Sequence, residues 1–368
     1  MATWSLTIIA RDVERELATT LDSITGIFDE VVVVDTGSTD GTVAVAESRG
    51  ARVGRFEWVD DFAAARNYAL SLATCDWVAW MDTGDVILPG HVADFLALKS
   101  SPSLDDPAVL GVACRFDRVM PDGTVVDSTV KARLARRELA VWTGAVHETL
   151  GVGVPDGEPW AIHHPATVTD PIPEGGSTIT DRNLRILRRM VEAGEGGPRI
   201  RFYLAYESEA RGMLDEAVGG YSSLANDRCD DVASRYYGHM AAVKGARLLT
   251  ARGDREGAIE LLTRATRIDP RKAEAFTLLG DAYEAENEYD LAIPYYRAAV
   301  GSPEPVDGSF YHPSGYGFWP LAKLGLCLAN SGQPSAALPI LEAARRSVPA
   351  DKAAELDEAI EKVRGVLK

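Results

Sequence analysis

Four consecutive valines at residues 31–34 give way at once to the polar segment Asp35–Thr42. A short β-branched run that stops at a cluster of Gly, Ser and Asp is typical of a buried strand in a parallel sheet. An earlier apolar segment ends at Ala10 and predicts another strand, with Arg11 and Asp12 at its carboxyl end. Open α/β sheets bind ligands at the carboxyl ends of their strands, so both polar turns are candidate binding elements. The alternative is an ordinary strand-to-helix turn.

Two further segments favour a ligand-binding role for these turns over ordinary strand-to-helix turns. Residues Phe56–Leu70 place Ala-Arg-Asn in a predicted helix, and residues Asp76–Asp85 join a short apolar strand to Asp-Thr-Gly-Asp. In this order, and together with the first two turns, the series resembles the inverting family 2 glycosyltransferases with the GT-A fold. The resemblance covers roughly residues 4–170. It implies an α/β domain with a Rossmann-like, mostly parallel sheet.

The resemblance also implies a nucleoside diphosphate sugar as donor, a UDP-sugar above all. The donor-binding side chains carried over from the family pattern are Arg11, Asp12, Asp35, Asp40, Asp61, Arg66 and Asp82. Arg66 lies in a helix otherwise lined with alanines, so its charge must reach a cleft or a partner. Asp35 could instead stabilise its own turn, and Asp40 or Asp61 could cap a helix.

A departure from the family pattern concerns the metal site. Relatives commonly carry Asp-Ala-Asp followed by an acidic residue. This chain reads Asp82-Thr83-Gly84-Asp85, so Gly84 stands at the second acidic position of the motif. A divalent cation, Mn²⁺ or Mg²⁺, needs carboxylate oxygens to neutralise a diphosphate leaving group. We expect Asp82 and Asp85 to be ligands, with glycine permitting a reshaped turn. His164 is the expected third ligand, and capping of the next turn is the alternative for Asp85.

The segment Val141–Glu148 resembles a Trp-x-Gly-x-Val-His-Glu stretch of family 2 members that carry helical repeats. An inverting transferase needs a base that deprotonates the acceptor as the sugar's C1 is attacked from the opposite face. We predict Glu148 as that base, with His147 beside it as a donor to phosphate or acceptor. In the alternative, His147 is the base and Glu148 orients it.

From about Arg199 onward, paired amphipathic helices replace the strands. The offsets of a tetratricopeptide unit, about 34 residues long, are matched by Phe276, Leu279, Gly280, Tyr283, Ala292, Tyr296 and Ala299. A generic helical bundle is the alternative. Such repeats form a concave surface suited to extended peptides, so we expect a polypeptide acceptor to bind there. The same surface could serve as a scaffold or as a homodimer interface.

The length of 368 residues suggests two domains. The resemblance and the repeat pattern imply a glycosyltransferase domain over residues 1–175, a connecting helix and linker over 176–198, and a repeat domain over 199–368. The net charge of −17 argues against a nucleic-acid partner. No apolar stretch is long enough to span a bilayer. The four scattered cysteines predict reduced thiols, and the first strand begins almost at Met1, so no signal peptide is expected. These features predict a cytoplasmic protein.

The sequence therefore predicts an inverting glycosyltransferase that moves a sugar from a nucleoside diphosphate to a protein or peptide side chain. Within the enzyme class, the alternative acceptor is a saccharide or a small molecule. From another class, Gly84 could mark a catalytically degenerate domain that binds a nucleotide sugar while the repeats act as an adaptor.

Overall fold

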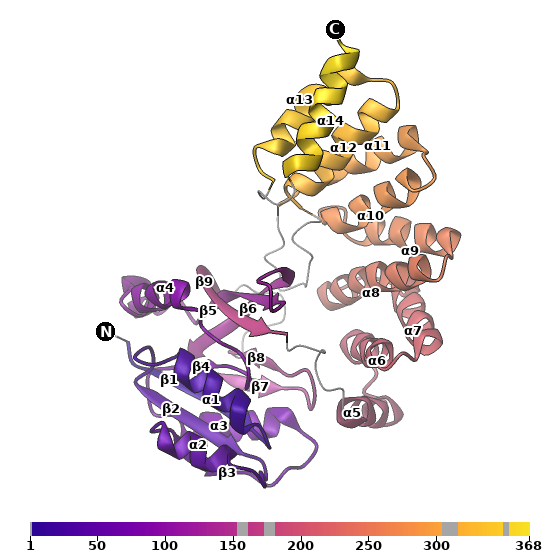
Figure 1. Ribbon diagram of the computed structural model, residues 1–368. Helices are drawn as coiled ribbons and strands as arrows, with labels where there is room; N and C mark the ends of the chain where they lie inside the picture. The colour runs from indigo at the N-terminus through magenta and orange to yellow at the C-terminus, as the bar shows by residue number, and fades with distance from the viewer. Residues whose placement is uncertain (1, 153–160, 173–180, 304–315, 349–352) are drawn as a thin grey trace. The chain divides into compact units, whose positions relative to one another are not determined.

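The computed structural model describes residues 2–152, 161–172, 181–303, 316–348 and 353–368 (Figure 1). The chain forms two compact units, Met1–Ile186 and Leu187–Lys368, which divide within helix α5 (Asp181–Glu192). The expected boundary at residue 175 lies outside the described residues, so the exact domain limits stay a prediction.

The first unit is built on a seven-stranded sheet with the strand order β3-β2-β1-β4-β6-β5-β9. The pairs β1–β2, β1–β4, β2–β3 and β5–β9 are parallel, whereas β6 runs antiparallel to both β4 and β5. The strands are β1 (Trp4–Ala10), β2 (Glu30–Asp35), β3 (Arg52–Arg55), β4 (Trp77–Trp80), β5 (Gly111–Val119), β6 (Val125–Arg136) and β9 (Ala161–Pro171). The predicted mostly parallel sheet is confirmed.

Helices connect the parallel strands, as a parallel pairing requires. They are α1 (Glu14–Ser23), α2 (Thr42–Ser48), α3 (Phe62–Leu72) and α4 (Pro89–Lys99), followed by a short 3-10 turn at Pro102–Asp105. Val32, Val33 and Val34 of the valine run are buried in β2, between β1 and β3, and Ala69 of α3 packs against Val32 and Val34. A small hairpin of β7 (Val141–Thr143) and β8 (Thr149–Gly151) stands outside the main sheet.

The second unit consists of successive helix pairs (Figure 1). Beyond α5 its helices are α6 (Pro198–Ala210), α7 (Leu214–Asn226), α8 (Val232–Ala251), α9 (Arg255–Ile268), α10 (Ala273–Glu284), α11 (Tyr289–Ala299), α12 (Phe318–Asn330), α13 (Pro334–Arg345) and α14 (Ala353–Val366). Among the described residues, no helix is both long and apolar enough to cross a membrane.

Small residues allow the two helices of a pair to approach closely. A Cβ atom added to Gly280 of α10 would lie 2.6 Å from the ring of Tyr296 in α11, and one added to Gly325 of α12 would lie 2.7 Å from Leu341 in α13. Tyr296 and Leu341 are fully buried. Glycine at these positions therefore leaves the space that a large side chain of the next helix fills. The predicted repeat pattern is confirmed.

Candidate functional site

Three polar segments meet at one edge of the sheet because β1 lies between β2 and β4, and all three run parallel. Asp12 follows β1, Asp35 ends β2 and Asp82 follows β4. The register pairs Ala10 with Asp35, and the Thr36 amide donates to the Ala10 carbonyl. The edge expected to bind ligand therefore carries the predicted acidic residues.

The turn after β2 is held by its own acidic side chains. Asp35, which is buried, accepts hydrogen bonds from the amides of Gly37 and Ser38. Asp12, at a positive φ of 51°, accepts from the Thr39 amide at 2.7 Å and from its hydroxyl. These bonds lower the pKa of Asp12. Both carboxylates thus have the turn-stabilising contacts given as the alternative to a donor-binding role.

Asp40 and Asp61 bind the starts of helices. Asp40 accepts from the amide and the hydroxyl of Thr42, which begins α2, and from the Glu14 amide, which begins α1. The hydrogen bonds from Thr42 lower the pKa of Asp40. Asp61 accepts from the Ala64 amide at 2.9 Å and is the N-cap of α3. Asp61 thus makes the expected capping contact, whereas the N-cap positions of α1 and α2 are Val13 and Gly41 rather than Asp40. Arg11 makes a 3.8 Å ion pair with Asp12, and both side chains are largely exposed.

Arg66 is the centre of a different arrangement. This arginine of α3 is 5% exposed. Its Nη2 lies 2.5 Å from Asp82 Oδ1, and its Nε donates to Glu148 Oε1. Burial opposes the charged guanidinium, but the two carboxylates outweigh burial, so the pKa of Arg66 is raised. The structure thus brings together three predicted site residues that are distant in sequence.

Two tryptophan rings enclose the same guanidinium. The Arg66 Cζ lies 5.0 Å from the centre of the Trp80 ring and 4.7 Å from that of Trp142, and the two rings meet edge to face. Arginine combines ion pairing with stacking on aromatic faces in a way that lysine does not. Neither tryptophan was among the predicted site residues, although both stand in the motifs that carried the resemblance.

Asn67 positions the segment that carries Glu148. Its amide oxygen accepts from the Trp142 amide and its Nδ2 donates to the Trp142 carbonyl, both at 2.9 Å. The Phe62 amide at the start of α3 donates to the Ala145 carbonyl. In α3, Arg66 thus binds the two carboxylates, Asn67 holds the backbone of β7, and the Phe62 amide holds the segment between β7 and Glu148. His147 has a positive φ of 51° in this segment.

The two aspartates of the loop after β4 differ in exposure and in their ion-pair partners. About half of the Asp82 side chain is exposed (50%), whereas Asp85 is 4% exposed and lies 3.2 Å from Arg133 Nη1. Desolvation would raise the pKa of Asp82, but the charge of Arg66 and two cations of β6 lower it. Burial outweighs the opposing charge of Arg133 and raises the pKa of Asp85 to about 6.

Gly84 has a conformational role in this loop. It has a positive φ of 100°, where side-chain-bearing residues are strained, and its amide donates to the hydroxyl of the buried Thr20 at 2.9 Å. The glycine therefore permits the reshaped turn that was expected. In the structure this turn directs Asp85 inward to Arg133.

Sequence reasoning missed two cations on β6. Lys131 and Arg133 are two residues apart on a strand and so share a face. The Lys131 Nζ lies 3.7 Å from the centre of the Phe116 ring, and the Arg133 Cζ lies 4.0 Å from that of Trp80. Burial and the neighbouring Arg133 lower the pKa of Lys131 to about 8. This alternation of basic residues in a buried strand is the signal that could have identified them.

His164 has contacts of another kind. Its Nδ1 accepts from the Ala166 amide at 3.2 Å, burial lowers its pKa, and the charge that opposes this effect is that of Asp94. Within the part of the chain that the structure describes, no three His, Cys, Asp or Glu side chains form a group suited to a metal ion. Ligation by His164 stays a prediction.

Comparison with known proteins assigns both parts of the chain. Residues 5–115 match the family Glycosyl transferase family 2, and residues 243–305 match Tetratricopeptide repeat. A TPR repeat-containing protein of Synechococcus elongatus is 27% identical over 280 residues, covering 63% of this chain and 68% of its own. An uncharacterized glycosyltransferase of Rickettsia conorii is 38% identical over 78 residues, 21% of this chain.

The match to the rickettsial protein spans 27% of that relative's length. Among solved structures, a glucosyl-3-phosphoglycerate synthase from Mycobacterium tuberculosis aligns with a TM-score of 0.25 at 23% identity, covering 32% of this chain and 44% of its own. The sequence matches agree with the observed sheet and helix pairs and confirm the predicted family and fold class. Residues 5–115 are therefore similar to family 2 glycosyltransferases, and residues 243–305 are similar to tetratricopeptide repeats.

Proposed function

We propose that this protein is an inverting glycosyltransferase that moves a sugar from a UDP-sugar to a side chain of a polypeptide. The observation that carries the proposal is the joining of Asp82 and Glu148 through the buried Arg66. A scaffold has no need of a buried guanidinium that binds two carboxylates from different loops, because such an arrangement is costly to bury. A site that must hold a donor and a base in fixed relation does need one.

In the proposed reaction, Glu148 accepts the proton of an acceptor hydroxyl or thiol. The acceptor atom forms a bond to the sugar's C1 as the bond from C1 to the diphosphate oxygen breaks on the opposite face, and UDP leaves. Arg66 binds Glu148 Oε1, so we assign the proton to Oε2. In the alternative, His147 takes the proton and Glu148 orients it.

A divalent cation, Mn²⁺ or Mg²⁺, belongs to this proposal with Asp82 as its principal ligand. The half-exposed carboxylate of Asp82 fits such a role, whereas Asp85 is buried against Arg133 and does not fit in this arrangement. The cation would neutralise the diphosphate leaving group. Lys131, whose charge acts on Asp82, supplies a positive charge to the same region below its lowered pKa of about 8. His164 is retained as a proposed third ligand.

Different observations support the proposed donor site and the proposed class of acceptor. The polar turns after β1 and β2 support a nucleotide at this edge, because such crevices bind ligands in open α/β sheets. The repeats support a polypeptide acceptor, because they form extended surfaces for peptides.

Titration of the full chain with UDP-, GDP- and dTDP-sugars, with and without Mn²⁺, tests the proposal. We expect metal-dependent binding of a UDP-sugar and slow release of UDP and free sugar. Glu148→Gln should abolish the release, whereas Glu138→Gln, the same change at an exposed residue, should not. Absence of nucleotide binding by the folded protein would instead favour the degenerate domain with adaptor repeats.

A further inference from the structure

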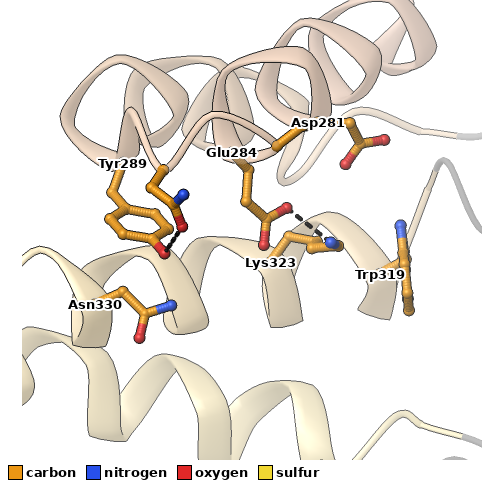
Figure 2. Close-up of a pocket in the computed structure, with 8 residues that line it drawn as sticks. Asp281, Glu284, Tyr289, Trp319, Lys323 and Asn330 are labelled. Carbon is orange, nitrogen blue, oxygen red and sulfur yellow. Dashed lines mark hydrogen bonds and ion pairs between the residues drawn. The ribbon is translucent and has the colours of Figure 1, made fainter.

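The second unit contains a pocket of about 410 Å³ between two successive helix pairs (Figure 2). It is lined by Asp281, Glu284, Ala285, Asn287, Tyr289, Trp319, Lys323 and Asn330. These residues come from α10, from the turn and start of α11, and from α12. The pocket therefore lies at the junction of α10–α11 with α12, and none of its lining residues is assigned to sugar transfer.

Two carboxylates on one side of the pocket share a buried phenol. The Tyr296 hydroxyl lies 2.7 Å from both Asp281 Oδ1 and Glu284 Oε2. Tyr296 is fully buried in the space left by Gly280, so its hydroxyl is held in place by packing. The repeat fold thus fixes the positions of both acidic groups.

One cation offsets these carboxylates only in part. The Lys323 Nζ lies 2.7 Å from Glu284 Oε2, and the Lys323 side chain is 23% exposed. Burial raises the pKa of Asp281, an effect that the hydrogen bond from Tyr296 and the charges of Lys323 and of Arg247, which does not line the pocket, oppose. With two carboxylates and one ammonium among its charged lining groups, the pocket favours a further positive charge.

Aromatic side chains stand at two places around the same pocket. The Trp319 ring centre is 5.3 Å from Lys323 Nζ, and the Tyr289 hydroxyl donates to Asn287 Oδ1 at 2.6 Å (Figure 2). Aromatic faces attract cations, and the flat guanidinium of arginine both stacks on such rings and donates two parallel hydrogen bonds to a carboxylate. Asp281 and Trp319 together offer these two interactions.

We propose that this pocket binds an arginine side chain of a polypeptide partner, with Asp281 as the principal acceptor and Trp319 as a stacking face. Lys323 remains with Glu284. The net charge of −17 favours a cationic partner in general, and the pocket gives that preference a specific position. This binding requires neither donor nor transfer chemistry, so it stands or falls separately from the proposed activity.

A direct test measures binding of the peptide acetyl-Gly-Gly-Arg-Gly-Gly-amide to the full chain by calorimetry, without any sugar nucleotide. The matched probe replaces arginine by citrulline, which has nearly the same shape but no charge. We expect the arginine peptide to bind at least about tenfold more tightly, the usual value of a charged hydrogen bond. Equal affinities, or preference for a glutamate peptide, would overturn the proposal.

Variants locate the site. Asp281→Asn and Trp319→Ala should each weaken the arginine peptide, while Glu286→Gln, the same class of change at an exposed residue outside the pocket, should not. Lys323→Gln should tighten binding, since it removes the competing cation. This gain keeps the proposal testable if Asp281→Asn disturbs Tyr296. A Glu286→Gln loss equal to that of Asp281→Asn, or no change in any variant, would contradict it.

Discussion

Two acidic turns at the same edge of the sheet use their carboxylates in opposite ways. In the turn after β2, Asp35 and Asp40 accept hydrogen bonds from backbone amides and a threonine hydroxyl of the turn and the helix starts. In the loop after β4, Asp82 and Asp85 are bound by the guanidinium groups of two arginines from other elements. The first turn is held mainly by backbone donors of the turn itself and of the starts of α1 and α2, whereas the second depends on arginine side chains from other elements.

This difference shows what holds each turn. A carboxylate bonded to nearby amides stabilises the conformation of its own turn. A carboxylate bonded to a buried arginine requires the whole domain, and its loss leaves an uncompensated charge in the interior. The loop after β4 is therefore where substitutions should have the larger effects on both stability and activity.

The largest expected effect follows from Arg66→Lys. An ammonium is a single point charge and cannot bind Asp82 and Glu148 with the geometry of a guanidinium, so one carboxylate loses its partner. We expect the free energy of unfolding of the first unit to fall by about 3 kcal/mol, with loss of donor hydrolysis. Urea titration followed by tryptophan fluorescence measures this in a Trp319→Phe background, since every other tryptophan precedes residue 187.

The matched control for that experiment is Arg55→Lys, at an exposed position of β3. It should leave the unfolding midpoint nearly unchanged, as surface substitutions usually do. Equal midpoints for the two variants would show that the Arg66 centre contributes little to folding and would remove the contrast between the two turns.

A smaller effect is expected for Asp35→Ala in the turn after β2. The change removes two hydrogen bonds to the amides of Gly37 and Ser38, each contributing about 1 kcal/mol. We expect a loss of about 2 kcal/mol in the same urea titration. Asp105→Ala, at an exposed residue, provides the comparison. A loss as large as that of Arg66→Lys would mean that the turn is not merely local.

The sequence predicted the fold well because its signals are local. The valine run with its polar stop, and the small residues such as Gly280 that accommodate large ones, follow from strand and helix periodicity. It also predicted Arg66, because a charge in an alanine-lined helix needs a partner. The partners themselves could not be derived, since Glu148 and Asp82 reach Arg66 only through the tertiary fold.

The cations of β6 were missed for a related reason. Lys131 and Arg133 stand in a strand whose buried face would ordinarily be apolar, and the inward turn at Gly84 brings Asp85 to Arg133. The sequence therefore predicts Asp85 as a metal ligand, whereas the structure shows it as the ion-pair partner of Arg133. The positive φ of Gly84 allows this turn, and no motif in the sequence specifies where the turn directs Asp85.

The smallest expected effect is a pH dependence that belongs to Asp85. Its pKa is about 6 in the folded protein against an ordinary value of 3.8, so the folded state holds the proton more tightly. The stability from this group is fully present below pH 3.8 and is lost as the pH rises through 6. Between pH 5 and pH 7.5 we expect the wild type to lose about 1 kcal/mol relative to Asp85→Asn. Urea titrations at both pH values in the Trp319→Phe background measure that difference.

The control for this prediction is the change with pH rather than the overall stability of the variant. Asp85→Asn leaves Arg133 without its ionic partner at every pH, so the variant's overall loss of stability does not report on the pKa of Asp85. Parallel pH dependences in the two proteins would show that Asp85 stays ionised throughout, held by Arg133, and both aspartates of this loop would then be alike in charge.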